Sequence, residues 1–185
     1  MKCKHIIALL FSPALSLPAI AGLTNTPVVV NGGTVHFSGQ VVSAACSVNA
    51  SSSAMTVQMG QVRTLTLATN GATGNSVPFS IILDNCDTSV ASNVSVAFKG
   101  TTVSGSPSIL ALSGSSNSSA SNLGVQILDR SGTPVTFDGA TWSAQNVLNN
   151  GRNYIPFVAR YIGVGSGGAV AGDASADANF SIQYQ

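Results

Sequence analysis

Few side chains in this sequence are able to do acid–base or nucleophilic chemistry. Its 185 residues include six acidic residues, all of them Asp, together with two His and three Cys. A nucleophilic triad needs a Ser, a His and an acidic partner, and no such motif accompanies His36. His36 is better explained as a polar residue on the wet face of a strand. We therefore expect no catalytic residues and a protein that is not an enzyme.

Two patterns resemble ligand-binding motifs, and each has a simpler structural explanation. Residues 163–168 have the spacing G-x-G-x-x-G of a nucleotide-binding loop, but no helix pattern follows them. A flexible loop before the last strand is the favoured interpretation. Asp84 and Asp87 would suggest calcium, but they lack the other ligands and the glycine spacing of a calcium loop. A polar turn is favoured there, so the sequence predicts no cofactor and no metal.

Sugars and nucleic acids are also disfavoured as ligands. Trp142, with Asp138 and Asn146, could line a sugar site, but a single Trp in a sheet protein belongs more often to a core or an interface. Charged residues make up only 7% of the chain and the formal net charge is +1. Such a surface has no basic field to hold phosphates, which disfavours a nucleic-acid partner, and we expect none.

The N-terminus has the pattern of a secretory signal peptide. Lys2 and Lys4 precede an apolar run over residues 6–17, and Ala19-Ile20-Ala21 forms a small-x-small cleavage site. A membrane anchor is the alternative, but this run is too short for a span that needs roughly 20 apolar residues. We predict a signal peptide over residues 1–21, and hence export.

Export also determines the state of the cysteines. Cys3 leaves with the signal peptide, so only Cys46 and Cys86 remain in an oxidising compartment. A pair of metal-ligating thiolates would need two further ligands and a C-x-x-C spacing that zinc sites use. The sequence therefore predicts one disulfide between Cys46 and Cys86.

The elements that position these residues are short strands. Apolar and polar residues alternate in runs that end at Gly, Asn, Asp or Pro, and no window has a convincing helical period. The predicted strands lie around residues 35–37, 55–59, 77–81, 94–98, 125–127, 135–137 and 154–161. Residues 104–123 are rich in Ser and are expected to be irregular. This pattern predicts an all-β antiparallel sandwich.

The two ends of the mature chain depart from an ordinary sandwich. From residue 172 onward the chain alternates without a break, which predicts a strand that runs to the last residue. Its dry face would carry Gly172, Ala174, Ala176, Ala178, Phe180, Ile182 and Tyr184. At the other end, Val35, Phe37, Gly39 and Val41 share one parity. This segment is predicted to be either an edge strand of its own domain or an arm that completes the sheet of another molecule.

Together these features resemble the major structural subunits of type 1 fimbriae, which are pilins of the chaperone–usher class. The resemblance covers essentially the whole chain. It rests on the signal peptide, residues 30–37, 44–46, 59–63, 84–87, 125–130 and 138–141, and a C-terminal strand with Gly172 fourteenth from the end and Tyr184 next to last.

The resemblance implies an immunoglobulin-like β-sandwich that lacks its last strand and is completed in trans by a donor strand. The donor extension would span residues 22–41, with Val35, Phe37, Gly39 and Val41 as its inward side chains, and the incomplete domain would span residues 42–185. The groove and chaperone-binding strand would carry Gly172, Ala178, Phe180, Ile182 and Tyr184.

The implied partners are identical subunits, a periplasmic chaperone, an outer-membrane usher, and the minor pilins and tip adhesin of an adhesive fimbria on the cell surface. Two alternatives stay open at this point. An adaptor or minor pilin would share the fold and the arm. A secreted carbohydrate-binding β-sandwich module would belong to a different functional class.

Overall fold

The computed structural model describes residues 27–114 and 118–185. The predicted signal peptide and residues 22–26 of the predicted arm therefore lie outside the described residues. Contacts divide the chain into two units, Met1–Gly39 and Gln40–Gln185, and each is described by itself. No helix among the described residues is long and apolar enough to cross a membrane.

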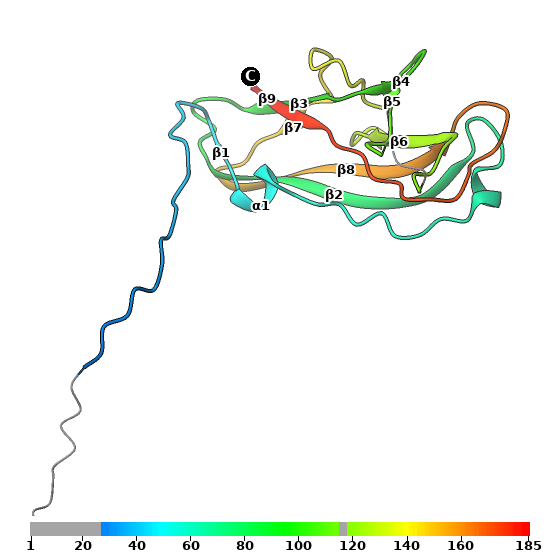
Figure 1. Cartoon of the computed structure of the whole chain (residues 1–185). Helices are drawn as coiled ribbons and strands as arrows, with labels where there is room; N and C mark the ends of the chain where they lie inside the picture. Colours follow the sequence, from blue (N-terminus) through cyan, green and yellow to red (C-terminus); the bar gives the residue numbers. More distant parts are fainter. Residues whose placement is uncertain (1–26, 115–117) are drawn as a thin grey trace, which may run out of the picture. The chain divides into compact units, whose positions relative to one another are not determined.

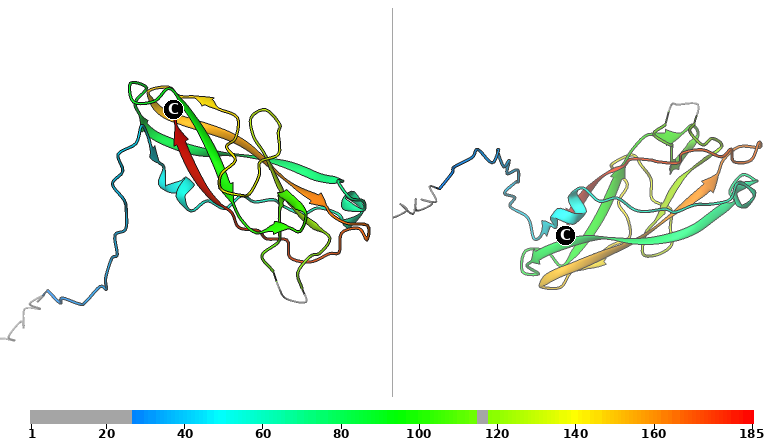
Figure 2. Two further views of the ribbon diagram at one scale, coloured as in Figure 1. Left: turned by 90° about the horizontal axis from the view of Figure 1, so that it is seen from above. Right: turned by 60° about the horizontal axis from the view of Figure 1, so that its bottom comes forward.

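The Gln40–Gln185 unit is a β-sandwich, as predicted (Figures 1 and 2). Its larger sheet has the strand order β1-β2-β8-β6-β5-β4, and its smaller sheet has the order β7-β3-β9. The elements are β1 (Ser47–Val48), α1 (Ala50–Ser53), η1 (Thr64–Leu67), β2 (Thr73–Cys86), β3 (Asn93–Lys99), β4 (Thr102–Val103), β5 (Ser106–Leu110), β6 (Leu123–Leu128), β7 (Asn146–Val147), β8 (Gly151–Gly163) and β9 (Asn179–Tyr184). All strand pairs within the two sheets are antiparallel.

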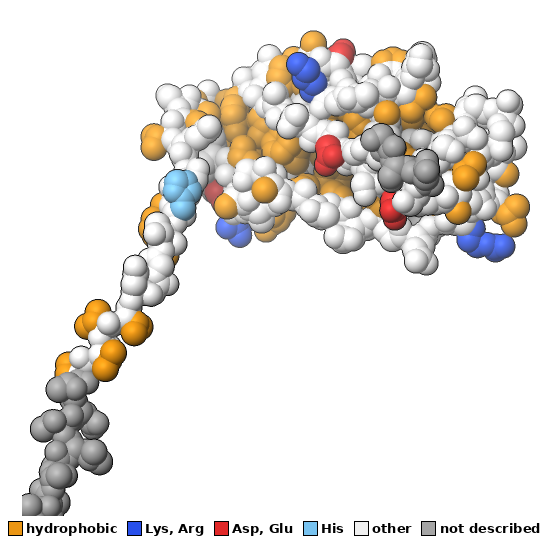
Figure 3. All heavy atoms as spheres, viewed as in Figure 1, with side chains coloured by type: hydrophobic (Ala, Val, Ile, Leu, Met, Phe, Trp, Pro, Cys, Tyr) orange, Lys and Arg blue, Asp and Glu red, His pale blue; other side chains and the backbone are white. Residues whose placement is uncertain are grey.

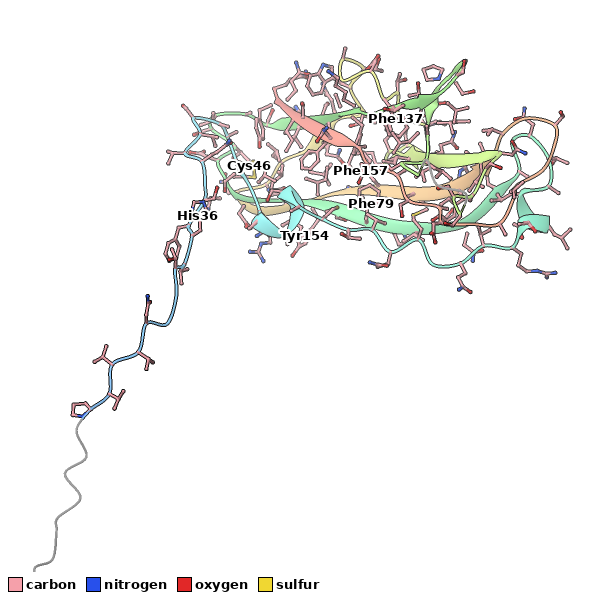
Figure 4. All side chains as sticks on the ribbon, viewed as in Figure 1. His36, Cys46, Phe79, Phe137, Tyr154 and Phe157 are labelled. Carbon is pink, nitrogen blue, oxygen red and sulfur yellow. A yellow bond between two sulfur atoms is a disulfide. The ribbon has the colours of Figure 1, made fainter. Side chains whose placement is uncertain are left out.

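Phenylalanines from both sheets meet in the core. Phe157 of β8 stacks on Phe79 of β2 with ring centroids 5.6 Å apart, and it meets Phe98 of β3 edge-on at 5.1 Å. Figure 4 shows Phe79, Phe137 and Phe157 inside the sandwich. Burial of each such side chain contributes roughly 1.5–3 kcal/mol, so these contacts hold the two sheets together.

The long β2–β8 pair forms the base of the larger sheet. Its odd-numbered residues point inward, as shown by Ile81 and Ile155, which lie opposite each other and are both buried. Pro156 lies on the exposed face of β8 and does not break the sheet. On the side of β8 away from β2, the neighbouring strand β6 ends at Leu128, which pairs with Val158. Pro156 therefore lies beyond the end of β6. In the described part of the chain it has a ladder neighbour only on the β2 side, opposite Ser80, and a proline is tolerated beside the free edge.

Four predicted segments differ from the structure. Residues 35–37 and residues 55–59 form no strand, because no strand in the described part of the chain pairs with either segment. Val135 and Phe137 are buried but form no ladder, because their N–H groups donate to carbonyls of different segments, Ile127 and Pro107. The supposedly irregular region 104–123 contains β5, which pairs with β4 and β6. Residues 115–117 of that region lie outside the described part.

The predicted disulfide between Cys46 and Cys86 is confirmed. The two Cα atoms lie 4.1 Å apart, and the bond joins residues 40 positions apart in the sequence. It fastens the segment before β1 to the end of β2. Closing a loop of this length is worth roughly 4 kcal/mol in the chain-entropy account, a large share of the stability of one domain.

Candidate functional site

An elongated groove of about 580 Å³ lies between the two edges of the sandwich. Residues 55–60 line one side and residues 174–178 with Phe180 line the other. The floor is formed by side chains of both sheets, namely Phe79, Ile81, Phe98, Leu110, Val125, Ile127, Ala159 and Tyr161. Figure 3 shows hydrophobic side chains along a hollow in this face of the domain. The groove therefore opens directly onto the hydrophobic core.

The first wall is a strand-like segment without a partner. Met55, Val57 and Met59 are half-buried while the residues between them are exposed, so this segment alternates like a strand. Among the described residues, the backbone N–H and C=O groups of residues 55–62 form no hydrogen bond with protein. The apolar alternation was visible in the sequence, but it did not reveal that this segment borders a groove. This wall presents an unused row of backbone donors and acceptors.

The second wall contains the last strand of the chain. β9 pairs with β3 from Val94↔Tyr184 to Lys99↔Asn179 and is the terminal strand of its sheet. Phe180, Ile182 and Tyr184 pack against the core, as their parity predicted. The other edge of β9 has no neighbouring strand in the described part of the chain. The groove is thus bordered by two extended segments, and among the described residues neither residues 55–60 nor β9 has a strand neighbour on the groove side.

The prediction of a single strand from residue 172 to the C-terminus is wrong in its first half. β3 ends at Lys99, opposite Asn179, so it offers no residues to pair with 172–178. The loop before β6 holds this half instead: the Asp173 N–H donates to the Ser118 carbonyl, and the Ser113 N–H donates to the Ser175 carbonyl.

Gly172 is required at the start of this wall for a steric reason. A Cβ at residue 172 would collide with backbone atoms of Ser118, Ser119 and Ala120. The backbones at this point are too close for any side chain. Sequence alternation identified the glycine but did not identify the loop that it touches.

Two tyrosines fasten the second wall to the domain. The Tyr161 hydroxyl donates to the Ala174 carbonyl at 2.8 Å, and the Tyr184 hydroxyl donates to the Cys46 carbonyl at 3.2 Å. Burial raises the pKa of both phenols, so they stay neutral donors at physiological pH. The wall is therefore held at both ends independently of β3.

The residues of the predicted donor extension are exposed in this chain. Phe37 is 88% exposed, Val35 and Val41 are also exposed, and nothing lies within 4 Å of a Cβ added at Gly39. Exposed valines and phenylalanine at alternate positions are unusual for the surface of a soluble protein. His36, labelled in Figure 4, is exposed between them.

The candidate ligand motifs have structural roles. Asp84 accepts hydrogen bonds from Arg152 and Asn49, which lower the pKa of its carboxyl group, and Asp87 accepts from both the side chain and the N–H of Ser89, which lower its pKa likewise. Residues 163–168 end β8 and lead into a bend without a helix. Among the described residues no three His, Cys, Asp or Glu side chains gather as a metal site would need.

Comparison with known families and sequences gives a consistent result over the whole chain. The model of the fimbrial protein family matches residues 35–185. The type-1 fimbrial protein A chain of Escherichia coli is 54% identical over 187 residues, covering 100% of both chains. The type 1 fimbrial subunit of Klebsiella pneumoniae is 51% identical over 186 residues, again covering 100% of both.

Solved structures show the same fold at lower identity. A chain of a chaperone–usher pilus, from a study of rod uncoiling, is 28% identical with a TM-score of 0.70 and covers 86% of this chain and 100% of its own. The P pilus rod subunit PapA is 27% identical with a TM-score of 0.66, covering 77% of this chain and 100% of its own. The match to these pilins agrees with an immunoglobulin-like sandwich.

Proposed function

The chain belongs to the fimbrial protein family, and from this premise we propose that it polymerises by donor-strand exchange. It is a structural subunit of a surface fimbrium and not an enzyme. In our proposal residues 22–41 of one copy enter the groove of a neighbouring copy as an additional strand. Repetition of this step builds a homopolymer in which every subunit is completed by the next.

The observation that carries the proposal is the complementarity between the groove and the extension. The groove has two unpaired edges and an apolar floor, and the extension is exposed with apolar residues at every second position. One wall contributes Ala174, Ala176, Ala178 and Phe180, also at every second position, which matches the four inward residues Val35, Phe37, Gly39 and Val41 in number and spacing. A strand inserted there would satisfy backbone groups on both sides.

The energetics favour a long-lived contact. Burial of Val35, Phe37 and Val41 would contribute roughly 1.5–3 kcal/mol each. Each new backbone hydrogen bond would add a net of about 1 kcal/mol. Gly39 would lie where the inserted backbone must approach the floor closely. The sum of these terms is large, so the inserted strand would dissociate very slowly and needs no chemical energy source.

Before assembly the open groove needs protection. An apolar groove with free strand edges promotes aggregation, so a periplasmic chaperone is expected to fill it with a strand of its own. An outer-membrane usher would then exchange that strand for the extension of the next subunit. Minor pilins and a tip adhesin would join the same chain of exchanges. Phe180, Ile182 and Tyr184 lie on the strand that would pair with the chaperone.

A synthetic peptide of residues 27–41 tests the proposal directly. Added to the full mature chain, it is expected to raise the melting temperature and to stop polymer growth, because it occupies the groove. A peptide of the same length with Phe37→Asp is the control and should do neither. Equal effects of the two peptides, or no effect of the native one, would contradict donor-strand exchange.

A further inference from the structure

A second hollow, of about 400 Å³, lies at the start of β8 and shares no residue with the assembly groove. Arg130 and Arg152 reach it from a loop and from β8, and Tyr154, Val147 and Asn149 also line it. This volume is within the range of small-ligand sites, whose upper limit is about 1,000 Å³. Neither the assembly groove nor the donor extension explains why two guanidinium groups converge here.

Both guanidinium groups are held in place and keep donors in reserve. Nη1 of Arg130 donates to the Gln145 carbonyl at 2.7 Å. Nε of Arg152 donates to Asp84 at 2.6 Å, and this side chain is 57% exposed. A guanidinium carries five N–H groups, so Arg130 retains several for a ligand, and Arg152 retains donors beyond those that meet Asp84 and the Tyr154 side chain. Fixed orientation lowers the entropy cost of binding.

The other side of the hollow offers an aromatic and an aliphatic surface. Tyr154 is 60% exposed and Val147 is 71% exposed. Tyr154 points away from the core side of β8, where Phe157 lies (Figure 4). A tyrosine in this position presents both a ring face and a hydroxyl. The hollow therefore combines guanidinium donors with a flat apolar patch.

The turn beside these residues is rigid. The side chain of Asn153 accepts from the Asn149 N–H at 2.9 Å and donates to the Asn149 carbonyl at 2.7 Å. Gly151 has φ of 90°, a left-handed conformation that other residues rarely adopt. These contacts fix the wall that carries Asn149 and Arg152 before any ligand arrives.

Two carboxylates lie near the arginines without using up their donors. Asp84 pairs with Arg152 through a single contact. Asp129, next to Arg130 in the sequence, keeps its charge and accepts from the N–H groups of Ser131, Thr133 and Ala144. The nearby charges therefore roughly cancel, and a carboxylate ligand would be held by the directed N–H donors of the two guanidinium groups and not by a net positive field.

We propose that this hollow binds a carboxylated sugar ring of the uronic or sialic acid class. Guanidinium groups pair with a carboxylate through two parallel hydrogen bonds. The ring would lie on the Tyr154 face, and Asn149, which also lines the hollow, would supply an amide to bond a hydroxyl. A peptide carboxylate would use the arginines but would leave the aromatic face without a ring. In a homopolymer the site would repeat on every subunit, so weak single contacts would add up to strong avidity.

Glucuronic acid and glucose are the probes for a saturation-transfer NMR experiment on the mature chain. Glucuronic acid is expected to bind and to receive saturation on its ring protons, whereas glucose, which lacks the carboxylate, should bind at least about tenfold more weakly. Acetate in excess should compete only weakly, because it has no ring. Equal binding of the two sugars, or full displacement by acetate at the concentration of the sugar, would overturn the proposal.

Three variants locate the site. Arg152→Gln and Arg130→Gln should each weaken glucuronic acid binding about tenfold or more, and Tyr154→Ala should remove the ring-proton signal. Arg63→Gln is the matched control, since Arg63 is exposed and lies outside the hollow. Melting temperatures establish that each variant is folded. An equal loss in Arg63→Gln, or unchanged binding in either arginine variant of the hollow, would refute the site, whether or not the chain polymerises.

Discussion

The hydroxyl of Tyr184 donates a hydrogen bond to the backbone carbonyl of Cys46, at 3.2 Å. This contact joins the penultimate residue of the chain to one half of the disulfide, 138 positions away in the sequence. The strand that borders the proposed assembly groove is therefore anchored to the covalent cross-link. We expect the disulfide to help to position β9.

Tyr184→Phe removes only this hydroxyl and keeps the ring that packs on the core. We expect the free energy of unfolding to fall by about 1 kcal/mol, the usual net contribution of one hydrogen bond. Leaving the Cys46 carbonyl without a donor would add a cost of similar size. Urea unfolding of the mature chain measures it. Tyr154→Phe is the control, because Tyr154 is exposed on the outer side of the sheet, and it should change stability much less.

Loss of the disulfide should lower the free energy of unfolding more than loss of the Tyr184 hydroxyl does. The Cys46→Ser/Cys86→Ser double variant is expected to lose roughly 4 kcal/mol, because the unfolded chain is no longer constrained by a closed loop. The measurement is thermal unfolding of periplasmic material, alongside reduced wild-type protein. If the disulfide also positions β9, Tyr184→Phe should lower the free energy of unfolding less in the Cys46→Ser/Cys86→Ser protein than in the wild type. Additive losses would show that the hydrogen bond and the disulfide stabilise the fold independently.

Asp138 gives the fold a dependence on acid pH. Its carboxylate accepts hydrogen bonds from the Thr141 side chain and from the N–H groups of Thr141 and Ala140, which lower its pKa to about 2. A depressed pKa in the folded state means that the ionised group stabilises the fold above the unfolded pKa of about 4, and that this contribution is lost as pH falls toward 2.

Asp138→Asn should therefore lower the melting temperature at pH 7 and approach the wild type between pH 4 and pH 2. Scans at closely spaced pH values would measure the difference. A gap between the two proteins that stays constant down to pH 2 would mean that the carboxylate charge contributes nothing to the turn.

Gly172→Ala is expected to disturb one wall of the groove. The added Cβ would collide with backbone atoms of the loop at Ser118 and Ala120, so residues 172–178 must move away from that loop. Overpacking of this kind costs roughly 1–3 kcal/mol. Gly132→Ala is a useful comparison, because nothing lies within 4 Å of a Cβ added at Gly132 and only its left-handed backbone would be strained. Faster hydrogen exchange across residues 173–177 should appear in the first variant and not in the second.

Alternation in the sequence predicted which side chains face inward, and that part of the fold is confirmed. β2, β3, β6 and β8 lie where the apolar period indicated, and the cysteine count predicted the disulfide. Alternation says nothing about which edge pairs with which. Residues 55–59 and 172–178 both alternate like strands, but neither forms a strand. Residues 55–59 have no pairing strand in the described part of the chain, and residues 172–178 bond to a loop instead. These two segments border the groove, so the least predictable part of the fold is its candidate site.

The last prediction concerns the phase of the donor extension. If Gly39 faces the floor of a neighbour's groove together with Val35, Phe37 and Val41, Gly39→Asn must displace packed atoms and bury an amide. Overpacking costs roughly 1–3 kcal/mol, and the buried amide adds a desolvation cost. We expect this variant to keep its own fold, since nothing lies within 4 Å of a Cβ at residue 39, and to fill its own groove with chaperone normally, yet to fail to add to another subunit.

Ser38→Asn is the matched control for this experiment, because a residue of the opposite phase points away from the groove when a strand is inserted. It should polymerise at close to the wild-type rate. The measurement follows purified chaperone–subunit complexes into heat-resistant polymers on gels, with melting temperatures of both variants to show that each is folded. Normal polymerisation by Gly39→Asn would mean that the extension enters in another register. An equal block by Ser38→Asn would mean that the groove does not distinguish the two faces of the extension, and donor-strand exchange in the proposed phase would have to be abandoned.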